Sequence, residues 1–357
     1  MNKRLLNAKL NYKELLKRVT VLESYPRMLF LELTRACNLA CPMCRSIRLT
    51  GRNLYMTDNV LTIIKEEIIP YVSVVDLRGW GESTLDSRLF SLIDEFTELG
   101  IRTRIYTNLT THDENYWYEM GAKKIDIAIS VDAANPQVYE NIRRGAKYSQ
   151  FLSNLKSLTK SRKEHNINSE TYFSMVVSDI NISQIPLIAK LAYEYNIPLI
   201  RLNPITVGQV HGRYPSKIGI SKDRYQEYLA AISEALEICR RKKIRLQLGA
   251  NIFPTNDGGF DLCIHPWTYV GIRYDGSVIF CDHLMANDSA IMGNIKKIPF
   301  KEIWNSPEYQ RLRKWHLRKN FVFLREQGIE CDWCYKNRYA DCEYLFHSKY
   351  KPLDLWR

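Results

Sequence analysis

The chain has 357 residues, 45% of them hydrophobic, which suits one large domain or a large domain followed by a small one. No run of eighteen apolar residues occurs and the first residues are too polar for a secretory signal, so we expect neither a membrane contact nor export. Nine cysteines without an export signal favour a reducing cytoplasm. The net charge of +12 fits a basic surface without a special role, an acidic substrate, or an acidic electron donor such as flavodoxin. No RNA-binding motif accompanies the basic clusters, so we expect no nucleic acid.

Strand-like and helix-like segments alternate through most of the chain. The predicted strands cover residues 28–33, 73–77, 102–107, 125–131, 171–177, 199–202 and 245–248, and the predicted helices cover 58–69, 89–99, 137–143, 151–164, 185–195 and 222–242. This alternation predicts an α/β fold in which a parallel sheet carries helices on its outside. Right-handed connections would curl about six such units into an open or closed barrel, with the active site at the carboxyl ends of the strands.

The pattern changes after residue 250. Segments 269–274 and 277–282 flank Asp275-Gly276, a dipeptide typical of a two-residue β-hairpin, and a helical segment follows at 300–318. We therefore expect a separate, smaller C-terminal module of a hairpin and helices. The predicted parts of the chain are an N-terminal helical extension packed on the barrel (1–27), the barrel (28–250) and the C-terminal module (251–357).

Three closely spaced cysteines follow the first predicted strand. Cys37, Cys41 and Cys44 form a C-x3-C-x2-C pattern, and thiolates this crowded usually hold a metal. Structural zinc takes four protein ligands, whereas this loop offers three, so an iron–sulfur cluster with one open iron fits better. An open iron can bind a substrate or cosubstrate, which suggests catalysis. The alternatives are three buried thiols or a zinc site completed from elsewhere in the chain.

The stretch from Thr34 to Cys44 resembles the signature of the radical S-adenosylmethionine (radical SAM) enzymes. This resemblance implies a partial (β/α)6 TIM-like barrel and a [4Fe-4S] cluster whose open iron is chelated by the methionine part of SAM. It also implies an electron donor such as flavodoxin or ferredoxin. In that family, SAM is cleaved to methionine and a 5′-deoxyadenosyl radical, which removes a hydrogen atom from the substrate.

Later segments resemble the SAM-contact regions of the same family, each after a predicted strand. Arg78-Gly-Trp-Gly-Glu-Ser83 resembles its Gly-Gly-Glu motif, whose acidic residue accepts a hydrogen bond from the SAM amino group. Thr107-Asn-Leu-Thr110 resembles Thr-Asn-Gly-Thr, with leucine in place of glycine. The resemblance further implies strand-end residues facing the ribose, an arginine for the SAM carboxylate and an apolar residue near adenine. The implied SAM-binding residues are Gly81, Glu82, Asn108, Ser130 and Asp132 (ribose), Arg143 (carboxylate, with Arg144 as its competitor) and Met43 (adenine).

Four cysteines of the C-terminal module could complete a second metal site. Cys263, Cys281, Cys331 and Cys334 suit zinc or a second cluster equally well on their chemistry. Their spacing, with Gly293-Asn-Ile and Glu302-Ile-Trp, resembles the SPASM and Twitch extensions of radical SAM enzymes, which implies one auxiliary [4Fe-4S] cluster. Cys342 is then surplus: it is either a buried thiol, a hydrogen-atom donor to a substrate radical, or a swapped ligand.

The substrate is less well defined by the sequence. A long loop with polar residues follows the strand that contains Arg201, and such loops at this end of a barrel usually serve binding. The candidate substrate-binding residues are Arg201, Asn203, Gln209, His211 and Arg213, unless the loop is simply solvated. We expect a polar small molecule, sugar-like or aminocyclitol-like, that is oxidised, epimerised or subjected to elimination. The alternatives are peptide modification or sulfatase maturation, and, outside catalysis, an iron–sulfur scaffold or electron carrier.

Overall fold

A computed structural model describes the chain at residues 3–44, 54–205, 219–250, 262–284, 287–329, 331–337 and 353–354. Within these residues an eleven-stranded sheet has the order β10-β9-β8-β1-β2-β3-β4-β5-β6-β7-β11. The strands are β1 (Met28–Leu31), β2 (Val74–Asp76), β3 (Arg102–Thr107), β4 (Asp126–Ser130), β5 (Thr171–Val177), β6 (Leu199–Pro204), β7 (Arg245–Leu248), β8 (Tyr269–Ile272), β9 (Ser277–Ile279), β10 (Ile291–Asn294) and β11 (Leu353–Asp354).

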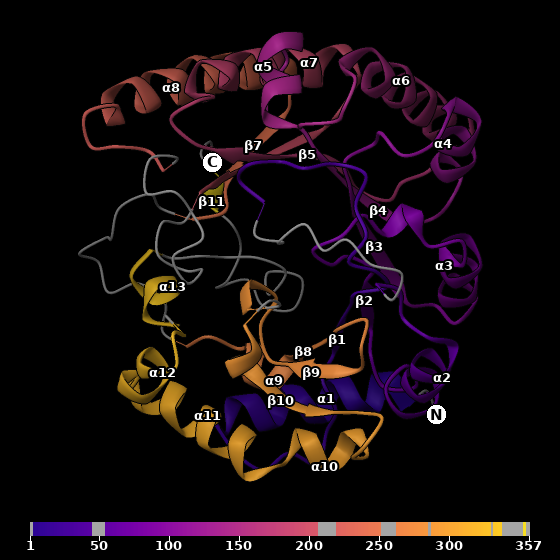
Figure 1. Cartoon of the computed structure of the whole chain (residues 1–357), viewed down its shortest axis with the longest axis vertical. Helices are drawn as coiled ribbons and strands as arrows, with labels where there is room; N and C mark the ends of the chain where they lie inside the picture. Colours follow the sequence, from indigo (N-terminus) through magenta and orange to yellow (C-terminus); the bar gives the residue numbers. More distant parts are fainter. Residues whose placement is uncertain are drawn as a thin grey trace.

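Strands β1 to β7 run parallel, each hydrogen-bonded to the next in chain order. The sheet curves without closing, and its connecting helices lie on the outer side of the curve (Figure 1). These helices are α2 (Asp58–Glu67), α3 (Leu89–Glu98), α4 (Glu114–Gly121), α5 (Pro136–Ile142), α6 (Tyr148–Glu164), α7 (Ile185–Glu194) and α8 (Tyr225–Lys242). The predicted α/β fold, a partial barrel with a parallel sheet, is therefore confirmed.

Alternation along the strands separates the hydrophobic core from the interior of the barrel. In β6, Ile200 and Leu202 belong to the large core beneath the helices, whereas Arg201 and Asn203 have the opposite orientation. A smaller apolar cluster, which includes Met28 of β1, fills one part of the interior. A third cluster, formed by Ala128, Tyr172 and Leu199, fills another part, and polar side chains such as Arg201 and Asn203 lie among these clusters.

Local signals explain most helix boundaries. Thr57 caps α2 by accepting a hydrogen bond from the backbone of Val60. The predicted helix 300–318 is two helices, because Ser306 caps a new one and Pro307 occupies its first turn. Helix α4 was not predicted, since its aromatic-rich sequence obscures the helical period. The remaining helices are α1 (Lys3–Leu16), α9 (His265–Thr268), α10 (Phe300–Trp304), α11 (Pro307–Arg318), α12 (Val322–Glu326) and α13 (Cys331–Asn337).

The C-terminal module continues the barrel sheet. The predicted hairpin is formed by β8 and β9, which pair antiparallel, with Gly276 in a left-handed conformation at its turn. Strand β8 also pairs in parallel with β1, so the hairpin shares hydrogen bonds with the strand that leads into the cysteine loop. The division into parts at residues 27 and 250 stays a prediction, but the sheet runs across the second boundary.

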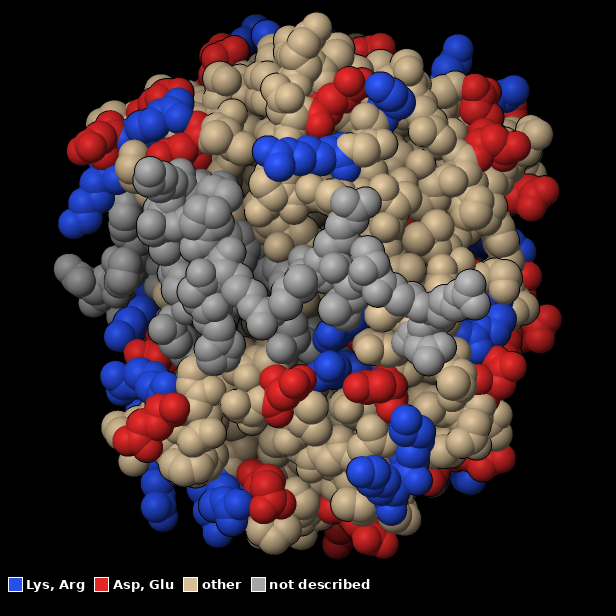
Figure 2. All heavy atoms as spheres, in the orientation of Figure 1, with Lys and Arg blue, Asp and Glu red and all other residues tan. Residues whose placement is uncertain are grey.

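Both signs of charge occur across the face shown in Figure 2, where lysine and arginine alternate with aspartate and glutamate. In the coloured part of this face, positive charge is therefore not gathered into one patch. No helix in the described ranges is both long and apolar enough to cross a membrane.

Candidate active site

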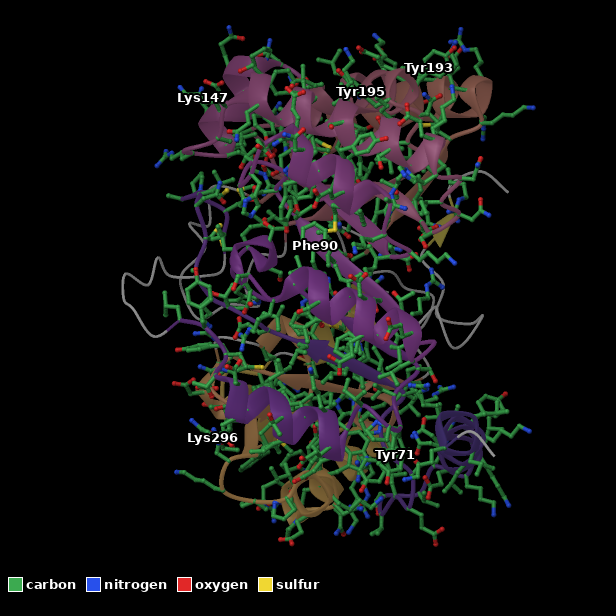
Figure 3. All side chains as sticks on the ribbon, turned by 90° about the vertical axis from the view of Figure 1, so that its right-hand side faces the viewer. Tyr71, Phe90, Lys147, Tyr193, Tyr195 and Lys296 are labelled. Carbon is green, nitrogen blue, oxygen red and sulfur yellow. The ribbon has the colours of Figure 1, made fainter. Side chains whose placement is uncertain are left out.

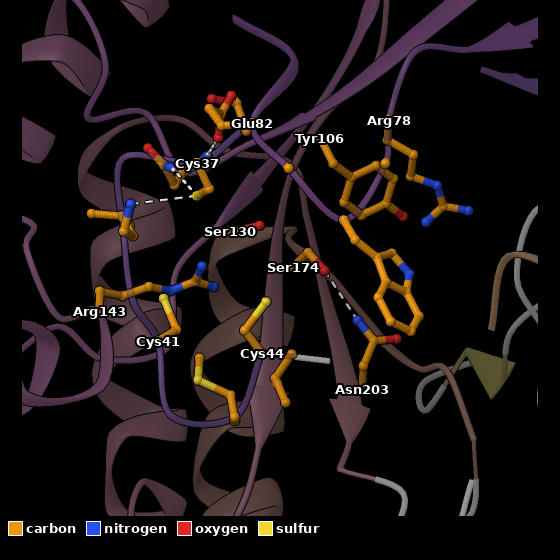
Figure 4. A pocket seen from close by; sticks show the side chains of 18 of the residues that line it. Cys37, Cys41, Cys44, Arg78, Glu82, Tyr106, Ser130, Arg143, Ser174 and Asn203 are labelled. Carbon is orange, nitrogen blue, oxygen red and sulfur yellow. Dashed lines mark hydrogen bonds between the residues drawn. The ribbon is translucent and has the colours of Figure 1, made fainter. Parts of the chain in front are cut away.

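A cavity of about 560 Å³ opens where the parallel strands end. Its wall combines the three N-terminal cysteines with side chains from the ends of β2 to β6 (Figure 4). Convergence at one edge follows from the parallel sheet, because all carboxyl ends of the strands meet there. Residues of this wall that bear on the argument are Cys37, Cys41, Met43, Cys44, Arg78, Gly81, Glu82, Tyr106, Asn108, Ser130, Arg143, Ser174, Asn203, Asp282 and His283.

The cysteine loop is held by backbone contacts on both sides. The Thr34 hydroxyl donates to the carbonyl of Leu54 at 2.9 Å and accepts from the amide of Ala36 at 2.9 Å. The Glu82 amide donates to the Ala36 carbonyl at 2.8 Å, which ties the loop to the segment after β2. A Cβ at Gly81 would lie 2.5 Å from the carbonyl oxygens of Thr34 and Ala36, so this approach requires glycine.

The donor set fits an iron–sulfur cluster better than a single ion. Burial raises the pKa of the Cys37 thiol to about 12, with Glu82 and the other two cysteines adding to the shift. Thiolates held together here would therefore need a cation beside them. Zinc bound by thiolates at about 2.3 Å would bring their sulfurs within ~4 Å of one another. Among the described residues, the ligand atoms of His265, Cys281 and Asp282 lie within 4.8 Å of one another, whereas those of the three N-terminal cysteines are farther apart than this.

Glu82 is buried at the cavity wall and its carboxylate organises the neighbouring loop. It accepts hydrogen bonds from the backbone amide of Asn108 at 2.7 Å and from the Thr84 hydroxyl at 2.8 Å. Burial raises its pKa, and these donors act against the increase. The Asn108 side chain in turn donates to Asn38 at 2.8 Å, beside Cys37. Both predicted SAM-binding residues therefore lie at the cavity while also fixing the loops around it.

Leucine at the family's glycine position has a left-handed backbone. Leu109 has φ of +62° and its side chain is fully buried. The conformation that glycine would provide is thus kept, at a steric cost of about 1–2 kcal/mol for a side chain with a Cβ. Buried apolar packing of Leu109 offsets this strain.

Arg143 and Asp132 form a buried ion pair behind the cavity. The guanidinium Nε lies 2.6 Å from the Asp132 carboxylate, whose other oxygen accepts from the Val176 amide at 2.8 Å. Burial alone would lower the pKa of Arg143, but Asp132, Cys41 and Tyr139 together outweigh it and the pKa is raised, so the guanidinium stays charged. Arg143 lies against Cys41 and lines the cavity, as Ser130 does, whereas the competing Arg144 is exposed. Asp132 itself is fully buried and does not line the cavity.

The deeper wall of the cavity carries polar groups from the middle strands. Asn203 donates to the Ser174 hydroxyl at 3.0 Å (Figure 4). Arg201 lies deeper in the barrel, is 2% exposed, stacks over Tyr172 at 5.2 Å and does not line the cavity. The other predicted substrate residues, Gln209, His211 and Arg213, lie outside the described residues.

Residues that the sequence did not indicate complete this wall. Arg78 packs 4.4 Å from the ring of Tyr106 and pairs with Asp282 at 3.4 Å, next to Cys281. His283 also lines the cavity. The signal available for Arg78 and Tyr106 was their place near the ends of β2 and β3. No local signal pointed to Asp282 and His283, because they reach the cavity from the C-terminal module.

The four cysteines of that module come together. Cys281 interacts electrostatically with Cys263, Cys331 and Cys334, and burial is the main reason why its pKa is raised. The Cys263 amide donates to the Tyr335 hydroxyl at 2.8 Å, which links the two ends of the cysteine set. Each of the four is half-buried. Cys342 lies outside the described residues.

Family models match the two parts of the chain that hold the cysteines. The radical SAM superfamily model matches residues 31–192, and the SPASM model, an iron–sulfur cluster-binding domain, matches residues 263–336. The cofactors that these families imply are a [4Fe-4S] cluster with SAM in the barrel and iron–sulfur binding in the C-terminal module. The cysteine positions described above fit both.

One similar protein covers most of the chain and another covers half of it. An AdoMet-dependent heme synthase of Methanosarcina barkeri is 23% identical over 91% of this chain and 96% of its own length. The mycofactocin maturase MftC of Mycolicibacterium smegmatis is 30% identical over 50% of this chain and 45% of its own length.

Solved structures show the same fold. Streptococcus suis SuiB bound to its precursor peptide SuiA superposes with a TM-score of 0.66 at 18% identity, covering 87% of this chain and 71% of SuiB. The structure of anSMEcpe with bound AdoMet superposes with a TM-score of 0.65 at 16% identity, covering 90% of this chain and 95% of anSMEcpe. The fold, the cysteine loop and the two family matches together assign the chain to the radical SAM superfamily, with a C-terminal SPASM-type iron–sulfur domain.

Proposed function

We propose that this radical SAM enzyme removes a hydrogen atom from a polar small molecule that binds in the cavity beyond the three cysteines. The observation that carries the proposal is the polar deeper wall, formed by Arg78, Tyr106, Ser174 and Asn203. The whole cavity of about 560 Å³ lies within the range of small-molecule sites, roughly 300–1,000 Å³, and the substrate shares it with the cluster and SAM. A hydroxylated substrate would find both donors and acceptors on this wall.

Each side of the cavity has its own task in this proposal. Cys37, Cys41 and Cys44 hold the cluster, which supplies the electron that cleaves SAM when both are bound. Arg143 offers a guanidinium to the SAM carboxylate and is kept charged by Asp132. Glu82, Asn108 and Ser130 line the space for the rest of SAM, and Met43 provides an apolar surface near adenine. In the C-terminal module, Cys263, Cys281, Cys331 and Cys334 hold one auxiliary cluster.

The reaction type follows from the auxiliary site. Asp282 links the cysteine set to Arg78 in the cavity wall, so the auxiliary cluster would adjoin the substrate. A cluster placed there can accept the electron that a substrate radical loses on oxidation. We therefore favour oxidation of a carbinol carbon over epimerisation or elimination, with flavodoxin or ferredoxin as the donor of the first electron. Membership of an enzyme family sets aside the scaffold alternative.

Peptide modification is the second candidate. SuiB is solved with its precursor peptide, anSMEcpe is solved with bound peptides, and MftC is named a maturase. At 18% identity or less, the structural likenesses extend to the fold only. A peptide substrate would need a path across the cavity mouth, whereas a small molecule needs only the polar wall.

The first experiment is anaerobic reconstitution, iron and sulfide counting, and a 5′-deoxyadenosine assay with SAM and dithionite. We expect about eight irons and formation of 5′-deoxyadenosine. Cys37→Ala, Cys41→Ala and Cys44→Ala should each abolish the product. Cys239→Ala is the matched control, because that thiol is buried in the core on α8. Product formation in any of the three loop variants would refute the assignment of the cluster ligands.

The second experiment separates the two substrate classes. Cell extract is divided by size into small molecules and peptides, and each fraction is tested for stimulation of 5′-deoxyadenosine formation. Asn203→Leu removes a polar group from the deeper wall and should weaken stimulation by the small-molecule fraction. Stimulation by the peptide fraction alone would replace the first proposal with the second.

A further inference from the structure

Helix α1 has the reverse of the usual amphipathic arrangement. Its buried residues are mostly polar: Asn7, Asn11, Glu14 and Leu15. Every exposed residue from 3 to 18 is basic, leucine or tyrosine: Lys3, Leu5, Leu6, Lys9, Tyr12, Lys13, Leu16, Lys17 and Arg18. Surface helices normally bury the apolar face, so the exposed leucines require an explanation.

Hydrogen bonds fix the rotation of this helix. The Asn7 amide donates to the carbonyls of Tyr25 and Tyr71 at 3.1 and 3.0 Å and accepts from the Tyr25 amide at 2.7 Å. Asn11 donates to the carbonyl of Trp267 at 2.7 Å, and Glu14 accepts from the amide of Glu23 at 2.7 Å. Turning the helix to bury its leucines would break these buried bonds, each of which is costly to lose. The outward orientation of the leucines is therefore built into the fold.

The exposed apolar residues form a stripe with positive charge beside it. Leu5, Tyr12 and Leu16 are spaced seven and four residues apart, so they lie on one side of the helix over about 16 Å. They are 52%, 42% and 60% exposed. Lys9 and Lys13 lie next to this stripe on the helix surface. In Figure 3, α1 lies at the lower right edge of the molecule with its side chains directed outward.

Helix α8 has a different arrangement. Its buried residues include Tyr228 and Ile232, and its exposed residues mix Glu227 and Glu234 with Arg240 and other bases. That pattern is the ordinary one for a solvated surface helix. The outer face of α1 has no exposed acid between residues 3 and 18.

We propose that the outer face of α1 binds the surface of a membrane that contains anionic lipids. Leucine and lysine on a helix lying along a surface suit the boundary between headgroups and acyl chains, where apolar burial and charge attraction add together. A second copy of this chain fits less well, because a symmetric contact through this face would bring the lysines of the two copies close together. The proposal replaces the expectation of no membrane contact with a peripheral one, without a spanning segment.

The position of α1 leaves the active site accessible during such binding. Tyr25 and Tyr71, whose carbonyls accept hydrogen bonds from Asn7, precede β1 and β2 in the chain. Helix α1 therefore lies at the amino ends of these strands. The cavity lies at their carboxyl ends. Vesicle binding should therefore be independent of SAM and of substrate.

The test is flotation of the cluster-loaded protein with lipid vesicles. Wild type should float with vesicles that contain phosphatidylglycerol, remain unbound with pure phosphatidylcholine, and bind less at high salt. Lys9→Gln with Lys13→Gln should lower the partition coefficient roughly thirtyfold, because each basic residue near an anionic surface contributes roughly five- to sixfold to binding. Leu5→Gln with Leu16→Gln keeps the charge and should lower it at least about tenfold.

The matched control removes the same charge elsewhere. Arg240→Gln with Arg241→Gln lies on α8 and should leave flotation unchanged. Loss of flotation in this control as large as in the α1 variants, or no flotation of wild type, would overturn the proposal. So would a concentration-dependent dimer that Leu5→Gln with Leu16→Gln abolishes without any vesicle binding. Binding of an acidic flavodoxin instead of vesicles, lost in the lysine variants, would assign the face to a protein.

Discussion

Substitution of Asp132 distinguishes two roles that the sequence and the structure give to this carboxylate. The family resemblance places it at the SAM ribose. In the structure it is fully buried, does not line the cavity, and lies 2.6 Å from the Arg143 guanidinium. A ribose contact would matter only when SAM is bound. A positioning contact would matter in the free protein as well.

The expected magnitude follows from the burial of the pair. Asp132→Asn preserves the shape of the side chain but leaves the Arg143 charge without its counter-charge, which costs about 3–5 kcal/mol. For 357 residues this corresponds to a fall of roughly 4–7 °C in the unfolding midpoint. Asp132→Asn with Arg143→Met removes the stranded charge as well. The double variant should therefore recover about 1–3 kcal/mol relative to Asp132→Asn.

The assay is thermal unfolding of the anaerobically reconstituted protein by circular dichroism, with SAM binding measured in parallel. Asp94→Asn is the control, because its pair with Lys123 has a similar length of 2.8 Å but is partly exposed, and should cost less than about 1 kcal/mol. If the double variant loses as much stability as Asp132→Asn and Arg143→Met lose in sum, the coupling between Asp132 and Arg143 is refuted. An unchanged midpoint with weakened SAM binding would restore the ribose role.

Three further outcomes test other parts of the structure. Leu109→Ala should lower the free energy of unfolding by about 2–5 kcal/mol through lost packing. Leu109→Gly should be about 1 kcal/mol more stable than Leu109→Ala in denaturant unfolding, because only glycine relieves the left-handed backbone. The opposite order of stability would refute the strain. Burial, with the nearby His265, lowers the pKa of His316 from 6.5 to about 3. Between these values the unfolded chain binds more protons than the folded one, so stability falls as the pH drops through this window. His316→Phe should flatten the dependence of stability on pH, and an unchanged slope would contradict the expected role of His316. Cys331→Ala should remove about four irons and leave the spectrum of the SAM cluster, whereas an unchanged iron content would mean that the second site is misassigned.

The sequence predicted the strands well because their signal is local. Strands 102–107 and 171–177 are short segments rich in β-branched and aromatic residues, and their observed limits agree with the prediction. The fate of side chains just past a strand is harder to predict. Ser130 and Asp132 are two residues apart and would share a face in a continuing strand, but β4 ends at Ser130 and the alternation ends with it. Ser130 therefore lines the cavity while Asp132 turns into the protein.

Groups supplied across long sequence distances could not be predicted in this way. Asp282 and His283 reach the cavity only because β8 pairs with β1, more than two hundred residues away along the chain. The buried Glu32 shows how tightly this junction is built. Its carboxylate accepts from the amide of Trp80 at 3.1 Å and from the amide of Tyr274 at 3.4 Å, beside the cysteine loop. A pairing of strands thus gives the C-terminal module its place at the cavity, because the sheet of the barrel continues into that module.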